Sequence, residues 1–292
     1  MIIINKIVNY TLSKLNLKLI KLSSLKPIKI NNFSNIIELD YIGNKNEIVV
    51  SLKTEKGRAL PIFDYSSKTI HPFVLSIKYG ANNFSKIHEI LSKYYNSYDP
   101  KFAVNIFDLK NNNDKTPYWA VVMPWDYETQ DEWKLKVENS VKNENLSLKK
   151  SMTIKSGWSW IGPSKKNKIF IESQRIYSIL KSIMKNGYLR NDNLDGDIRA
   201  NILTNEKGQW VWQSISGQHR ACCLSGLGFM EIPVRINKII RRSDVCSWPN
   251  VVRGKYSKEE ALIIFDTIFN SSFNSQYLNE WMSCVNQIKS DA

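Results

Sequence analysis

The chain has 292 residues, and its 42% of apolar residues is enough to bury a substantial core, so global disorder is not expected. Four unevenly spaced cysteines, with no CxxC pair and no His/Cys cluster, argue against a disulfide framework and against zinc, and they favour a reducing, cytoplasmic location. The net charge of +14 comes from lysines in asparagine-rich runs, so two interpretations stay open: solvated lysines of a biased composition, or binding to anionic partners.

Residues 1–37 form a basic leader. Ile4, Val8, Leu12 and Leu15 recur at helical spacing, and six lysines precede the first acidic residue, Glu38. This pattern predicts an amphipathic helix over residues 1–22 that lies on an anionic membrane surface. A helix packed on the protein, followed by a strand at residues 17–22, is equally compatible with the pattern. No apolar run reaches the roughly 20 residues that span a bilayer.

The length of the chain favours two compact units, of which the first is a mixed α/β unit of unknown role at residues 38–127. Strands are predicted at residues 47–52, 58–63 and 71–77, followed by a helix over residues 85–95 with Ser85 as its N-cap. His71 and His88 fit local packing or hydrogen bonding better than metal ligation. Residues 128–155, which are charged and rich in asparagine, are predicted to be a helical connector.

The second unit is predicted at residues 156–250. It begins with a helix over residues 170–186 that ends at Gly187, followed by two strands at residues 198–203 and 210–215 joined by a hairpin turn. A short helix over residues 219–227 ends at Gly228 and leads into a further strand from residue 231. In the helical tail, residues 251–292, Ser257 and Glu260 have the spacing of a capping box.

The stretch "SGQHR", residues 216–220, forms the corner between the second strand and the short helix. Ser216 is a suitable N-cap, and Gly217 lets the backbone turn tightly and approach a ligand. The start of a helix leaves N–H groups unpaired and carries a partial positive charge, to which His219 and Arg220 would add. The corner therefore predicts a phosphate-binding site. The alternative is that Arg220 makes a structural ion pair and His219 caps the helix.

The helix "ESQRIYSILKSIMKNGY", the two strands and "ISGQHRACCLSGLGFMEIPVRI" resemble, in this order, the ParB/sulfiredoxin-like superfamily over about residues 165–240. The resemblance implies an α/β (α+β) domain with a small mixed sheet and flanking helices. It also implies a nucleotide, ATP or CTP with Mg²⁺, whose phosphates lie at this corner. The matching residues are Gly217, His219 and Arg220, and Ser216 and Gln218 complete the turn.

The chain departs from the pattern of that superfamily in two places. Gln218 stands where sulfiredoxins carry their reactive cysteine, so sulfiredoxin activity is not expected, and Cys222 and Cys223 are predicted to pack inside the helix. No helix-turn-helix reader is evident after residue 250, which makes nucleic acid the less favoured partner. The "GQHR…WPNV" end also resembles uncharacterised bacterial proteins, some of them encoded beside cell-surface glycan genes.

Phosphoryl transfer needs positioned cations and a carboxylate that orients or deprotonates the acceptor. Glu172 and His219 are the predicted catalytic residues, and Arg175 is a further phosphate ligand. The alternative for Glu172 is a solvated carboxylate at the start of the helix. Possible substrate or metal-adjacent residues are Asp195, Asp197 and Arg253. For the two aspartates the alternative is a plain turn role. The favoured function is a nucleotide-dependent phosphotransferase, hydrolase or switch. The alternative is a non-catalytic nucleic-acid-binding or membrane-associated regulatory protein.

Overall fold

The computed structural model describes residues 28–30, 38–41, 48–60, 62–80, 83–107, 109, 115–146, 152–190, 197–273 and 275–291. The predicted membrane-binding segment 1–22 and the alternative strand at residues 17–22 lie outside the described residues, as does Asp195. Within the described part of the chain, no helix combines the length and the hydropathy that crossing a membrane requires.

A six-stranded mixed sheet, in the order β1-β2-β6-β4-β5-β3, organises the fold. β4 and β5 form the predicted antiparallel hairpin, while β6 lies parallel to β4 and antiparallel to β2. The prediction of an α+β fold is confirmed. The strands are β1 (Ile28–Ile30), β2 (Ile48–Lys53), β3 (Gly57–Arg58), β4 (Arg199–Thr204), β5 (Trp210–Ser216) and β6 (Glu231–Arg241).

The first and the second predicted units both contribute to this sheet. In the β2–β6 pair, Val50 lies opposite Val234 and Leu52 lies opposite Ile232. Buried side chains from both units also belong to one hydrophobic cluster. The described residues of the two units therefore share one sheet and one core.

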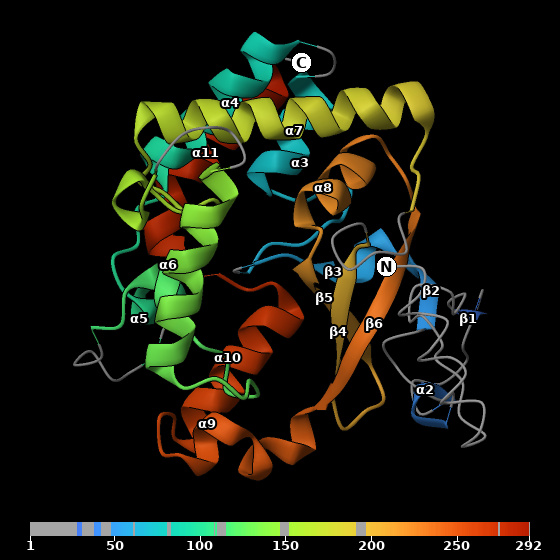
Figure 1. Ribbon diagram of the computed structural model, residues 1–292, viewed down its shortest axis with the longest axis vertical. Coiled ribbons are helices and arrows are strands. Elements are labelled where there is room, and N and C mark those ends of the chain that lie inside the picture. Colours follow the sequence, from blue (N-terminus) through green and yellow to red (C-terminus); the bar gives the residue numbers. More distant parts are fainter. Residues whose placement is uncertain are drawn as a thin grey trace, which may run out of the picture.

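α8 lies between the sheet and α7, so the candidate corner is at the end of the sheet that faces α7 (Figure 1). α7 crosses that end and packs against α4 and α8, whereas α9 and α10 lie at the opposite end. The helices are α2 (Glu38–Tyr41), α3 (Pro72–Gly80), α4 (Phe84–Ser97), α5 (Ala103–Phe107), α6 (Gln130–Leu146), α7 (Lys166–Asn186), α8 (Gln218–Gly226), α9 (Pro249–Val252), α10 (Lys258–Asn270) and α11 (Ser275–Ser290).

Several predicted elements agree with the structure. α6 supplies the helix expected within residues 128–155, and α7 contains the helix expected over residues 170–186. Gly187 follows α7 with φ 70° and Gly228 follows α8 with φ 87°, as expected for glycines that end helices. The capping box of Ser257 and Glu260 is present at the start of α10.

Three local predictions in the first unit are wrong. Within the strand predicted at residues 71–77, residues 72–77 form the start of α3, because the run is buried on all sides and its pattern does not distinguish the two periods. Pro72 also suits the first position of a helix. Of the described residues in the strand predicted at 58–63, only Arg58 is in a strand, and Asn83 caps α4 instead of Ser85.

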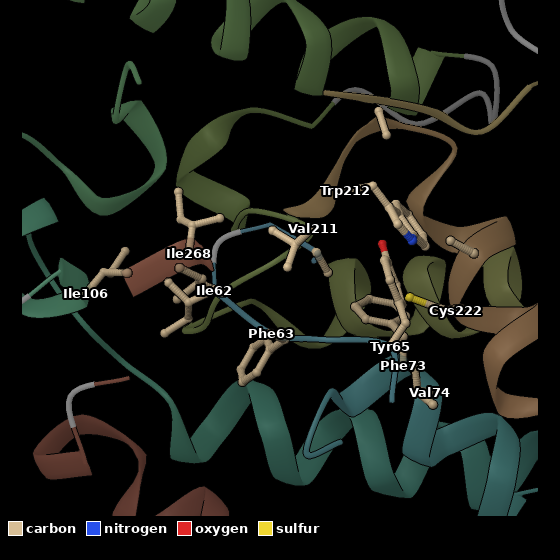
Figure 2. Packing of buried hydrophobic residues seen from close by; sticks show 14 of the residues in the cluster. Ile62, Phe63, Tyr65, Phe73, Val74, Ile106, Val211, Trp212, Cys222 and Ile268 are labelled. Atoms are coloured by element: carbon tan, nitrogen blue, oxygen red, sulfur yellow. The ribbon is translucent and has the colours of Figure 1, made fainter. Parts of the chain in front are cut away.

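Aromatic packing fixes α8 to the sheet. Tyr65 stacks on Trp212 of β5 with ring centroids 5.2 Å apart, and its hydroxyl lies 2.8 Å from the Ser214 hydroxyl. Cys222 of α8 lies beside the Tyr65 ring (Figure 2). Burial raises the pKa of the Cys222 thiol and that of the Cys223 thiol. Both cysteines therefore pack in the core, as predicted, and are poorly suited to react.

The loop at residues 157–164, which precedes α7, is clamped onto α4. The hydroxyls of Tyr94 and Tyr95 donate hydrogen bonds of 2.6 Å to the carbonyls of Trp160 and Ser159, respectively. At Gly162 the backbone approaches α4 so closely that an added Cβ would lie 2.3 Å from the Tyr95 carbonyl oxygen. Since that neighbour is backbone, the contact has no flexible side chain that can move aside.

We expect Gly162→Ala to lower the free energy of unfolding by about 3 kcal/mol, because overpacking against fixed atoms is costly. Gly254→Ala is the control. Gly254 has φ 74° and open space around it, so its substitution should cost only about 1–2 kcal/mol of backbone strain. Denaturant unfolding of both variants measures the two costs, and an equal or smaller cost for Gly162→Ala would contradict the close packing of this loop.

Candidate functional site

The corner between β5 and α8 depends on a left-handed glycine. Gly217 has φ 73° and ψ 19°, and a Cβ there would lie 2.9 Å from the Asp197 carbonyl oxygen and from the Ile198 Cα. Gly217 occupies the N-cap position, so the prediction of Ser216 as the N-cap is wrong, and no side chain caps the helix. The N–H groups of Arg220 and Ala221 donate to the Gly217 carbonyl at 3.0 Å.

The first turn of α8 therefore leaves donors at the corner. In the described part of the chain, the backbone N–H groups of Gln218 and His219 have no acceptor. Groups of this kind, together with the partial positive charge of the helix start, favour an anion nearby.

A cavity of about 400 Å³ opens at this corner. It brings together every residue predicted to bind phosphate, from α7 and from the β5–α8 turn. α6 and the loop before α7 complete its walls. The lining residues are Leu60, Ser140, Trp160, Arg175, Ile179, Ile215, Ser216, Gly217, Gln218, His219 and Arg220.

A larger hollow of about 640 Å³ lies along α7 and shares Arg175 and Ile179 with this cavity. Arg175 is the one charged side chain among its described lining residues, whereas the smaller cavity also contains His219, Arg220 and the start of α8. The smaller cavity therefore concentrates the groups that can bind an anion, and it is the candidate site.

Glu172 lies behind this cavity, at the centre of a buried ion cluster. Its side chain is fully buried, so the alternative of a solvated carboxylate is wrong. Lys168 Nζ lies 2.7 Å from Oε1, and Arg175 Nη1 donates to Oε1 at 2.8 Å and to Oε2 at 3.0 Å. The Ser159 hydroxyl donates to Oε1 at 3.1 Å. On the other side, His219 Nε2 lies 3.0 Å from Oε2.

The cluster keeps Glu172 ionised. Burial alone would raise the pKa of the carboxyl, but the hydrogen bond with His219 and the charges of Lys168 and Arg175 outweigh burial and hold this pKa below its usual range. With all these partners and no exposed surface, the carboxylate does not line the cavity. Glu172 is therefore placed to orient His219 and Arg175 and not to contact a ligand directly.

The orientation of His219 follows from this bond. An ionised carboxylate can only accept, so in the neutral ring Nε2 carries the proton and Nδ1 keeps a lone pair. No described residue is hydrogen-bonded to Nδ1. The ring is held between Phe73, in an edge-to-face contact at 5.2 Å, and Trp160 at 4.7 Å. His219 thus lines the cavity with its ring held in one orientation.

Arg220 differs from Arg175. Its guanidinium has no hydrogen-bond or ion-pair partner among the residues that the structure describes, although its charge acts on the hydroxyl of Tyr188. It lines both the candidate cavity and a neighbouring hollow of about 300 Å³ that contains Tyr188. The alternative of a structural ion pair for Arg220 therefore finds no partner in the described part of the chain.

The side chain of Gln218 is engaged by the protein. Its side-chain Oε1 accepts a hydrogen bond of 2.9 Å from the Leu60 N–H, and the residue is buried. Gln218 therefore fixes the Leu60 segment as one wall of the cavity.

The remaining candidates have structural partners. The Asp197 carboxylate accepts hydrogen bonds from Arg190 Nε at 2.9 Å and from Arg235 Nε at 2.7 Å. It therefore connects the loop after α7 with β6. Arg253 follows α9 at the far end of the molecule, where Nη1 donates to Asn250 Oδ1 at 3.3 Å. The structure thus places the Asp197 backbone at the corner but engages its side chain, and it does not bring Arg253 to the cavity.

His71 and His88 behave as predicted. The Phe73 N–H donates to His71 Nδ1 at 3.2 Å, and Cys222 Sγ lies 3.5 Å from Nε2. Burial, aided by the charge of His219, lowers the pKa of His71 to about 3, so this ring is neutral. His88 Nδ1 lies 3.0 Å from the Ser173 hydroxyl. Both rings serve local packing and hydrogen bonding.

Sequence reasoning missed Lys168 and Trp160. Lys168 did leave a signal, because Lys168, Glu172 and Ile176 recur every four residues and lie on the buried face of α7. Trp160 left no such signal, because its place in the cavity depends on the packing of the loop at residues 157–164 against α4.

The cavity does not fit a protein-held Mg²⁺. Magnesium takes oxygen ligands and in phosphate sites is usually held by one or two carboxylates together with the phosphates. No acidic residue is among the described lining of the cavity, and both nearby carboxylates, Glu172 and Asp197, are engaged by cations. More generally, the described residues contain no group of three or more His, Cys, Asp and Glu side chains that could hold a metal ion.

No protein-family model matches this chain, and no curated protein or solved structure does either. The likeness to the ParB/sulfiredoxin-like superfamily therefore stays a prediction from the sequence.

We expect Glu172→Gln to lower the free energy of unfolding by about 3–5 kcal/mol, because an amide leaves the buried Lys168 charge without its counter-ion. Chemical denaturation measures the loss. The exposed Glu259→Gln is the control and should change stability by less than about 0.5 kcal/mol. Adding Lys168→Met to Glu172→Gln should restore part of the stability. A single variant as stable as wild type would contradict the ion cluster.

The same cluster predicts a pH dependence. Because folding lowers the pKa of Glu172, its contribution to stability is present above its ordinary pKa of 4.5 and is lost as the pH falls below that value. Unfolding of wild type and of Glu172→Gln is measured between pH 7 and pH 3. The stability difference between them should shrink only at the acidic end, and a difference that shrinks from pH 7 to pH 5 would point to another group.

Proposed function

We propose that this chain binds a nucleotide with its phosphates in the cavity at the β5–α8 corner and acts on a phosphate bond of that ligand. The observation that carries the proposal is a set of donors without partners at the cavity. Among the described residues, the Arg220 guanidinium and the backbone N–H groups of Gln218 and His219 have no hydrogen-bond or ion-pair partner. A bound anion would satisfy these donors and pair with the charge of Arg220.

The phosphates would have two kinds of donor, guanidinium groups and backbone N–H groups. Arg220 offers its guanidinium, Arg175 lines the cavity while Glu172 holds it in place, and the first turn of α8 offers the N–H groups of Gln218 and His219. Arginine forks and helix starts are both suited to phosphate oxygens. Gly217 allows the turn that presents these N–H groups, since it has φ 73° and a Cβ there would meet the Asp197 carbonyl oxygen.

His219 is the candidate general base. Glu172 accepts from Nε2, so Nδ1 can take the proton of a water or an acceptor hydroxyl as its oxygen attacks phosphorus and the bond to the leaving phosphate breaks. The imidazolium that forms would be stabilised by the adjacent carboxylate. Mg²⁺ would arrive with the nucleotide and neutralise its phosphates, and no described side chain is assigned to hold it.

We expect Arg220→Ala to weaken the binding of ATP or CTP by about 1.5–3 kcal/mol, the scale of a lost hydrogen bond to a charged group, while Tm without ligand changes little. Melting curves with and without nucleotide measure both effects, because a ligand that binds only the folded state raises Tm. The charge-matched control is Arg253→Ala, which removes an exposed arginine outside the cavity and should leave the nucleotide shift unchanged.

Two outcomes would overturn the proposal. One is a wild-type Tm that does not move at millimolar nucleotide with Mg²⁺. The other is an equal shift in the Arg220→Ala protein. Phosphate release then separates an enzyme from a switch: turnover by wild type that is lost in His219→Gln supports catalysis, whereas saturable binding without turnover supports a non-catalytic role.

A further inference from the structure

The lining of the candidate cavity has two chemically different parts. Arg220 and the first turn of α8 form the cationic part, which suits phosphate. Leu60, Trp160, Ile179 and Ile215 supply apolar and aromatic surface in the same cavity. A free polyphosphate uses only the first part. A ligand that fills the cavity therefore needs an anionic end and a largely apolar end.

Trp160 is the largest side chain in the apolar part, and its position is fixed. Its carbonyl accepts the hydrogen bond from Tyr94, and the preceding carbonyl accepts from Tyr95. Its ring packs on Phe73 with centroids 5.5 Å apart and on His219 at 4.7 Å. An indole held in this way loses little freedom when a planar ring packs against it.

We propose that Trp160 is the platform for the heteroaromatic ring of the ligand, so that the cavity selects nucleoside phosphates over phosphates without a ring. This inference rests on the proposed function, because it takes the phosphate position from the corner. The expected occupant is a nucleobase, because it has a flat π surface with polar edges. Stacking of that surface on tryptophan is favourable for every base. A saturated lipid chain or a bare sugar would gain no such contact.

The adjacent His219 favours the same geometry. The Trp160 ring packs against His219 but is only half-buried, and both residues line the same cavity as Arg220. A ring stacked on the uncovered part of Trp160 would therefore lie in the cavity that is proposed to hold the phosphates. Trp158, two residues earlier on the same loop, lines a different and much smaller apolar hollow of about 20 Å³. The pair of tryptophans therefore offers a matched comparison within one loop.

The test measures dissociation constants by calorimetry for ATP, CTP, inorganic tripolyphosphate, ribose 5-phosphate and geranyl phosphate. Wild type should bind the two nucleotides more tightly than tripolyphosphate. Trp160→Leu should weaken nucleotide binding by about 5- to 100-fold, the range of a lost base stack, and should leave tripolyphosphate unchanged. Trp160→Phe should retain most of the nucleotide affinity, and Trp158→Leu should behave as wild type towards every ligand.

The outcomes separate this inference from the proposed function. Two results would overturn the stacking role: nucleotides that bind no more tightly than tripolyphosphate, or a Trp160→Leu variant that binds all ligands equally more weakly. If tripolyphosphate binding still depends on Arg220, the phosphate site remains intact. Tightest binding by geranyl phosphate would replace the nucleobase with an apolar chain. If none of these anions binds, both proposals are wrong.

Discussion

The site depends on one buried carboxylate. Glu172 joins three segments: α7, on which it lies, the clamped loop through Ser159, and α8 through His219. It also holds two cations, Lys168 and Arg175, in a part of the molecule where neither would be stable without a counter-ion. The same group thus connects the packing of the helices with the chemistry of the corner, and removing it would disturb both.

This arrangement determines the charge at the cavity surface and the orientation of the His219 ring. Because the carboxylate is saturated by its own partners, its negative charge does not repel a ligand at the cavity surface, while Arg220 and the start of α8 remain available for an anion. The bond to Nε2 sets which nitrogen of His219 can act as a base. Glu172 is better understood as a positioning residue than as the catalytic residue that the sequence predicted.

Some of this could be predicted from the sequence. The hairpin, α8 and the end of α7 follow from turn and glycine signals, and the "SGQHR" run identifies the corner because glycine, histidine and arginine meet at a helix start. The predictions that were wrong concern features that depend on tertiary contacts. The run at residues 72–77 is buried throughout, so its pattern did not distinguish helix from strand. Asp197 is a substrate or metal candidate by sequence, but in the fold its carboxylate is paired with Arg190 and Arg235. The contribution of Trp160 required the clamp to α4, which no local pattern encodes.

The most direct measurement is long-range proton–nitrogen NMR of the histidine rings, of which the chain has three. At a pH where the rings are neutral, His219 and His71 should each carry their proton on Nε2. His88 should carry its proton on Nδ1, because the Ser173 hydroxyl beside it donates to the Ile169 carbonyl and can only accept from the ring. Adding ATP should shift the His219 Nδ1 resonance and leave those of His88 unchanged. A proton on Nδ1 of His219, or a spectrum that does not respond to ATP, would contradict the account of an oriented base in a phosphate site.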